Sequence, residues 1–147
     1  MRRKLFIGAG ALLLALGLAQ LHVPARENPP VTSEAPAPEP VRVALRTACY
    51  DCHSNETRWP WYARVAPASW LVARDVVEGR AHLNFSEWDR YPEGKRARLL
   101  EEIREEVEEG GMPLGIYVLM HPDARLRPEQ VQLLMDWTRG GARTEAP

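Results

Sequence analysis

The chain holds one C-x-x-C-H pattern, formed by Cys49, Tyr50, Asp51, Cys52 and His53, which contains the only two cysteines among its 147 residues. This pattern is typical of the covalent attachment of c-type haem. Each thiol can add across one vinyl group of the porphyrin, and the adjoining histidine then lies under the iron as an axial ligand. The motif therefore predicts one haem c per chain, with Cys49 and Cys52 as its thioether anchors and His53 as the proximal iron ligand.

Three other chemistries use paired cysteines. A thioredoxin-like C-x-x-C needs a βαβ context, which the sequence lacks, and a zinc site needs at least one more ligand and usually a second cysteine pair. A structural disulfide remains open, because the N-terminus carries an export signal and the compartment outside the cytoplasm is oxidising. The protein would then be a haem-free module that presents a tryptophan-rich surface to a partner.

Composition limits the fold and the function. With 45% hydrophobic and 27% charged residues and a formal net charge of −1, the chain has room for one globular domain of roughly 100 residues plus tails. The balanced charge argues against a nucleic-acid partner. The sequence also lacks a P-loop, a G-x-S-x-G motif and a glycine-rich dinucleotide fingerprint.

The N-terminus is typical of an exported protein. Residues 2–4 are basic, and residues 5–25 contain no Asp, Glu, Lys or Arg. This layout predicts that residues 1–25 are a signal peptide or an uncleaved membrane anchor. We favour the anchor, because the apolar region is long and the possible cleavage sites after Ala19 and Ala25 are weak. The basic start would stay in the cytoplasm, which places the domain in the periplasm or its equivalent. Cleavage would instead release the protein into the periplasm.

A proline-rich segment follows at residues 26–40. Alternating Pro and Ala cannot build a core and favour an extended polyproline-II chain. At ~3.1 Å per residue, such a linker would hold a domain up to ~50 Å from the membrane. We expect it to act as a spacer and to have no other role.

The remaining sequence predicts an all-α domain. Apolar residues recur at helical spacing in four segments, and no segment shows the sustained alternation of a strand. Pro40 lies near the start of the first helix, Ser69 is the expected N-cap of the second, and Gly110 and Gly140 are the expected stops of the last two. The predicted helices are 41–49, 69–79, 94–109 and 128–138.

Four short helices joined by long loops bury little apolar surface, and small domains of this kind are marginal without added support. We therefore expect a small cytochrome c-like domain over residues 41–140, in which the haem supplies the missing centre. A flexible tail is expected over residues 141–147.

The second axial ligand is predicted from position alone. Met112 lies between the third and fourth predicted helices, where its thioether can meet the iron from the face opposite the histidine. Met120, His121 and His82 are alternatives, and Met135 lies on the apolar stripe of the last helix, which favours a core role. An open sixth position would shift the function toward ligand sensing or peroxide chemistry.

Aromatic residues follow the motif closely. The simplest interpretation of Trp59, Trp61, Trp70 and Trp88 is that they are large core residues. In a functional alternative, Trp59 and Trp61 form a haem wall, and their indole N–H groups hold the haem propionates together with Arg58.

Several segments together resemble the bacterial haem-binding domain family. The similar segments are 49–62, 69–72, 82–88, 112–113 and 119–126. Members of that family are small exported relatives of c-type cytochromes, often with an N-terminal anchor. The resemblance spans about residues 40–140. It implies covalent haem at Cys49 and Cys52, and iron ligation by His53 and by Met112.

The sequence therefore predicts a single-haem electron carrier rather than an enzyme, bound to the membrane through its N-terminal helix. Its partners would be other redox proteins, whose identity the sequence does not specify. The alternative function is a haem-based sensor or a peroxidase-like protein with an open or displaceable sixth iron ligand.

Overall fold

A computed structural model describes residues 2–144 of the chain, and over these residues the protein is all-helical, as predicted. The α-helices are α1 (Arg2–Ala19), α2 (Glu39–Ala48), α3 (Tyr50–His53), α4 (Ala68–His82), α5 (Glu93–Glu109), α6 (Gly115–Met120) and α7 (Pro128–Thr144). Short 3₁₀ turns, named η1 to η4, lie at Gln20–His22, Trp61–Arg64, Trp88–Arg90 and Pro122–Ala124.

The helix ends follow local rules in two cases and depart from them in two. Pro40 lies in the first turn of α2, and α5 ends where Gly110 takes a left-handed φ of 73°, both as predicted. Ser69 is not an N-cap, because α4 begins at Ala68 and buries Ser69 inside the helix. Nor does Gly140 stop α7, which continues to Thr144. Residues 145–147 of the predicted tail lie outside the described residues.

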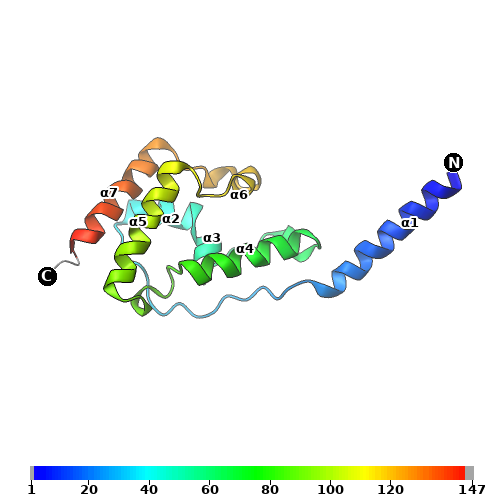
Figure 1. The fold of residues 1–147 in the computed structure, drawn as a ribbon, viewed down its shortest axis with the longest axis horizontal. Helices are drawn as coiled ribbons and strands as arrows, with labels where there is room; N and C mark the ends of the chain where they lie inside the picture. The colour runs from blue at the N-terminus through cyan, green and yellow to red at the C-terminus, as the bar shows by residue number, and fades with distance from the viewer. Residues whose placement is uncertain (1, 145–147) are drawn as a thin grey trace.

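The core forms where α2, α5 and α7 meet. The helix α5 packs against α7, and α2 contacts both α7 and α3 (Figure 1). Leu45, Leu99 and Leu134 provide one fully buried leucine from each of the three core helices. Aromatic residues extend this core toward the C-x-x-C-H motif, because Tyr50 stacks on Phe85 with ring centroids 5.3 Å apart. The motif is therefore attached directly to the best-packed part of the molecule.

The proline-rich segment is not the free spacer that its composition predicted. It is extended, but its carbonyl groups accept hydrogen bonds from the domain: the Asn55 side chain donates to Pro30 O and the Trp137 indole donates to Pro36 O, both at 2.9 Å. Ala35 is buried in the core. Prolines remove backbone donors but leave acceptors, so a polyproline-like chain can still dock wherever a domain offers N–H groups.

The helix α1 projects away from the rest of the molecule (Figure 1). Together with η1 it forms a 21-residue helical stretch, Arg2–His22, that is long and apolar enough to cross a membrane. A signal sequence would have the same length and composition. Its C-terminal end contacts the domain, because the Trp70 indole donates to His22 O at 2.9 Å.

Candidate functional site

The C-x-x-C-H motif forms the tight junction between α2 and α3. Cys49 is both the C-cap of α2 and the N-cap of α3, and its N–H donates to Leu45 O at 2.8 Å. The N–H groups of Cys52 and His53 both donate back to Cys49 O, at 3.2 and 2.9 Å. This single turn places the two cysteines and the histidine on one short helix, and both thiols are free.

The imidazole of His53 is held by the backbone of α4. Its Nδ1 lies 3.1 Å from Gly79 O and 3.2 Å from Leu83 O, so Nδ1 carries the proton and donates to these carbonyls. A hydrogen bond of this kind fixes the tautomer and leaves Nε2 as the metal-binding atom. Burial lowers the pKa of His53, which favours the neutral form that binds a metal.

A glycine allows α4 to approach the motif closely enough for this contact. A Cβ atom built on Gly79 would lie 2.6 Å from Cys52 O, inside the closest distance that real Cβ contacts reach. Any larger residue at this position would push α4 away from α3. Gly79 therefore serves two roles, because its small size permits the approach and its carbonyl orients His53.

The two thiols lie in a protected environment. Burial raises the pKa of Cys49 to about 12 and that of Cys52 to about 11, so both stay protonated at neutral pH. Such thiols are poor nucleophiles for disulfide exchange. Among residues 2–144, the structure also brings together no group of three His, Cys, Asp or Glu side chains that could hold a metal ion.

Two adjoining cavities meet at the motif, with volumes of about 110 and 370 Å³. Both are lined by Cys49, His53, His82 and Met112, and we refer to them together as the motif cleft. The smaller cavity has an apolar wall made by Leu83, Phe85, Leu99, Ile103 and Val107. The larger cavity falls within the range of about 300–1,000 Å³ that small-molecule and cofactor sites occupy, and the smaller one extends it with an apolar wall.

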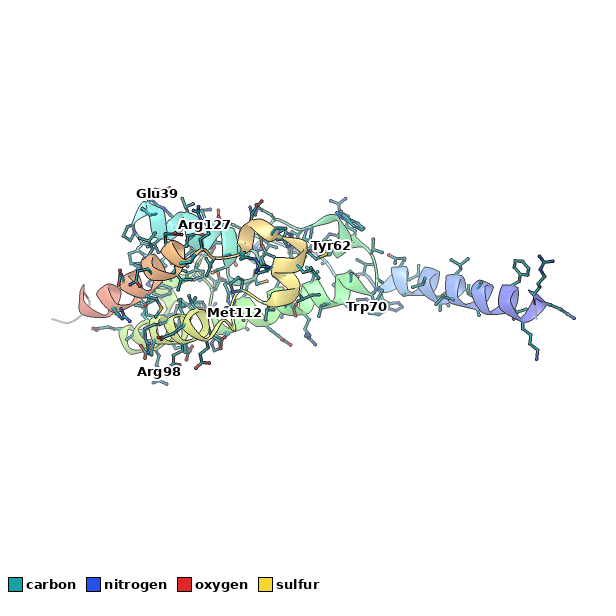
Figure 2. All side chains as sticks on the ribbon, turned by 90° about the horizontal axis from the view of Figure 1, so that it is seen from above. Glu39, Tyr62, Trp70, Arg98, Met112 and Arg127 are labelled. Atoms are coloured by element: carbon teal, nitrogen blue, oxygen red, sulfur yellow. The ribbon has the colours of Figure 1, made fainter. Side chains whose placement is uncertain are left out.

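Met112 reaches this cleft because of the way α5 ends. The left-handed turn at Gly110 reverses the chain, and the Met112 N–H then donates to Glu106 O at 3.1 Å. Figure 2 shows Met112 on the segment between α5 and α6, over the middle of the domain. The structure thus places a thioether on the same cleft as the imidazole, although the two residues are far apart in the sequence.

Comparison with protein-family models identifies the family of the chain. Residues 11–140 match the model of a family described as a haem-binding domain. The chain belongs to the haem-binding domain family. Neither the curated proteins nor the solved structures include a match to it. The motif cleft of this haem-binding domain fits its group, because it offers two thiols, an imidazole with a free Nε2, a thioether and an apolar wall.

The structure also places the other candidate axial ligands of the haem-binding domain. His82 lines the motif cleft, and its Nε2 lies 2.9 Å from Glu102 Oε2. His121 is outside this cleft, stacked on the Tyr117 ring with centroids 4.3 Å apart. Met120 lines a separate cavity beside Cys52. Met135 is buried, in agreement with its predicted core role.

Three residues that were expected at the haem lie outside the motif cleft. The Trp59 indole donates to Asn28 Oδ1 in the proline-rich segment, at 3.1 Å. Trp61 is 74% exposed and points away from the core. Arg58 lines the separate cavity beside Cys52 and pairs with Asp51, its Nε and Nη2 each 3.1 Å from a carboxylate oxygen. The tryptophan wall with Arg58 stays a prediction, and the contacts that these side chains make lie outside the motif cleft.

Sequence reasoning missed the residues that support the motif from other elements. Asp51 is buried and accepts a hydrogen bond from the Tyr117 hydroxyl at 2.7 Å, in addition to its pair with Arg58. Arg80 joins the loop after the motif to the proline-rich segment, donating to Ser54 O, Thr57 Oγ1, Glu27 O and Asn28 Oδ1. A glycine inside an otherwise helical pattern was the one available signal for Gly79.

Proposed function

We propose that this haem-binding domain is a single-haem, c-type electron carrier. Cys49 and Cys52 form the thioether bonds, His53 is the proximal ligand and Met112 the distal ligand. One observation carries the proposal: the two cavities of the motif cleft share Cys49, His53 and Met112, while the backbone of α4 holds Nδ1 of His53. A haem bound there supplies an iron that gains and loses one electron.

The chain's own residues would tune this exchange. The carbonyls of Gly79 and Leu83 fix the plane of the His53 ring, so the ligand does not reorient between redox states. The apolar wall excludes water, and Met/His ligation raises the reduction potential relative to other axial pairs. Because α3 is anchored to the aromatic core through Tyr50, the site is rigid, which suits a carrier that must change little as it cycles.

The proposal includes a membrane tether on the extracytoplasmic side. It is supported by the basic residues 2–4 and by the 21-residue apolar helix Arg2–His22, which is exposed along its length. The intact mass of protein from the membrane fraction tests both parts together. We expect the full chain plus one haem; a mass that lacks residues 1–19 or 1–25 would refute the tether alone.

The haem assignment is tested by expression with a cytochrome c maturation system. We expect haem staining that survives denaturation, a c-type visible spectrum, and a reduced form that resists carbon monoxide. Met112→Ala should change the iron ligation and admit carbon monoxide. Met120→Ala is the matched control, because Met120 lies outside the motif cleft and its loss should leave the spectrum unchanged. A colourless protein, or an unchanged spectrum in Met112→Ala, would contradict the proposal.

A second candidate function follows from His82. Its side chain lines the same cleft as Met112 and pairs with Glu102. If Met112 does not bind the iron, His82 would be an acid–base group beside an open sixth position. The protein would then be a haem-based sensor or a peroxidase-like protein. Rapid carbon monoxide binding by the wild-type reduced protein, with peroxide turnover lost in His82→Ala, would favour this function over electron transfer.

A further inference from the structure

Four apolar side chains are exposed within residues 61–71, the stretch that runs from η2 to the start of α4. Their exposed fractions are 74% for Trp61, 44% for Val65, 43% for Trp70 and 44% for Leu71, and we call this surface the η2 face. Two exposed tryptophans in one short segment are unusual on a soluble protein, because burying an aromatic side chain is strongly favourable. A surface of this kind marks a contact with a partner or a membrane.

Every charged residue in the sequence of the η2 face is basic, although two of its arginines pair with carboxylates outside this stretch: Arg58 with Asp51, and Arg74 with Asp75 and Glu78. Residues 57–74 contain three of the five tryptophans and three arginines, Arg58, Arg64 and Arg74, but no aspartate or glutamate. This absence is notable in a chain that has as many acidic as basic residues overall. Tryptophan with arginine and without carboxylates is the composition found where proteins meet the headgroup region of a bilayer.

The position of α1 identifies the bilayer as the occupant. The Trp70 indole donates to His22 O, and the Gln20 side chain donates to Ala66 O at 3.4 Å, so the end of the apolar helix touches the η2 face directly. Arg26, four residues further on, donates to Ala63 O in η2 at 3.4 Å. Figure 2 shows Trp70 where α1 meets the rest of the molecule. If α1 spans the membrane, these contacts hold the η2 face at the level where the helix leaves the lipid.

We propose that the η2 face rests on the membrane surface and holds the domain in a fixed orientation beside its anchor. This inference depends on the tether proposed above, but not on the haem. Trp61 and Trp70 lie at the level of the headgroups, and Arg64, which is exposed at the end of η2, contacts lipid phosphates. Because the proline-rich segment is bound to the domain, it does not extend the distance between the domain and the membrane. The motif cleft therefore stays near the bilayer, where membrane-bound redox partners are found.

Lipid photolabelling of the full chain tests this contact. The protein is placed in nanodiscs of phosphatidylcholine and phosphatidylglycerol that include a phospholipid with a diazirine close to its headgroup, and it is then irradiated and digested with trypsin. Cleavage after the arginines separates residues 59–64 and 65–74, which together cover the η2 face, from residues 126–139 of α7. We expect lipid adducts on the first two peptides and on the α1 peptide, but not on residues 126–139.

A variant that adds a negative charge to the η2 face strengthens the test. Trp61→Glu should lower the labelling of residues 65–74 by roughly fivefold, because one charge near an anionic membrane surface changes local binding by about that factor. Leu133→Glu is the control for adding a negative charge elsewhere, since Leu133 is also an exposed apolar residue, 40% exposed, and lies on α7, away from α1. Its labelling should equal that of the wild type.

Each outcome bears on one proposal. Adducts confined to α1, or equal labelling in Trp61→Glu and the wild type, would overturn the membrane contact and leave the η2 face to a protein partner. Loss of residues 1–25 from the mature protein would also overturn it. Haem staining of the same samples reports separately on the proposed function, so a haem-loaded protein without lipid adducts contradicts only this inference.

Discussion

Replacing Gly79 with alanine tests how α4 holds the haem motif. In an unhindered helix interior, glycine to alanine stabilises a protein by up to about 1 kcal/mol, because alanine loses less backbone freedom on folding. At Gly79 the new Cβ would lie 2.6 Å from Cys52 O, whereas ordinary contacts begin at 3.4 Å. The difference of 0.8 Å has to come from movement of α4 away from α3, because the obstructing atom belongs to the backbone.

The size of the effect follows from these opposing terms. Overpacking of this kind costs about 1–3 kcal/mol, which offsets the gain of about 1 kcal/mol in helix propensity. We therefore expect Gly79→Ala to lower the free energy of unfolding by up to about 2 kcal/mol. The same movement displaces Gly79 O, which accepts a hydrogen bond from His53, so the iron ligation should also be disturbed.

Gly94→Ala is the matched control, because Gly94 lies in α5 and a Cβ there meets no atom within 4 Å. Urea unfolding of the full chain in a mild detergent, followed by circular dichroism, measures both free energies of unfolding. Gly94→Ala should be about 1–3 kcal/mol more stable than Gly79→Ala, and only Gly79→Ala should show a changed visible spectrum. Equal stability of the two variants would refute the close-approach argument.

Two further predictions concern pH and the proline-rich segment. Burial raises the pKa of Tyr50 from 10.0 to about 12, so the folded protein keeps a proton that the unfolded chain loses, and stability should fall as the pH rises from 10 to 12. Urea unfolding across that range should give a shallower loss for Tyr50→Phe; an identical slope would contradict the assignment. Arg80→Ala should increase amide hydrogen exchange in residues 26–40 while haem stays attached, because Arg80 holds both Glu27 O and Asn28 Oδ1. Arg74→Ala, which removes an exposed arginine of the same helix, should leave that exchange unchanged.

Local sequence was sufficient for the features that depend on neighbouring residues. The C-x-x-C-H spacing located the haem motif, several segments together indicated the family, and helical periodicity located α2, α4, α5 and α7. The stop of α5 at Gly110 was readable because a left-handed φ strongly favours glycine. The roles of the two thiols, His53 and Met112 stay predictions, and the structure supports them by lining one cleft with these residues.

Composition misled where distant contacts decide. Residues 26–40 have the composition of a free linker, yet the side chains of Asn55 and Trp137 donate hydrogen bonds to their carbonyl groups. No local sequence pattern predicts a donor that lies 25 or 101 positions away. Trp59 and Trp61 follow the motif in sequence but turn toward the proline-rich segment and the solvent. Sequence proximity to a site therefore says little about which side chains face it.

The amino-acid order by itself determined that two thiols and an imidazole share one helical turn, since that follows from short-range backbone geometry. Only the tertiary structure decided how the imidazole is oriented, because its hydrogen-bond acceptors, Gly79 O in α4 and Leu83 O just after it, lie 26 and 30 positions further along the chain. The approach of α4 to α3 depends on packing between elements, and packing is a property of the whole fold rather than of any single segment.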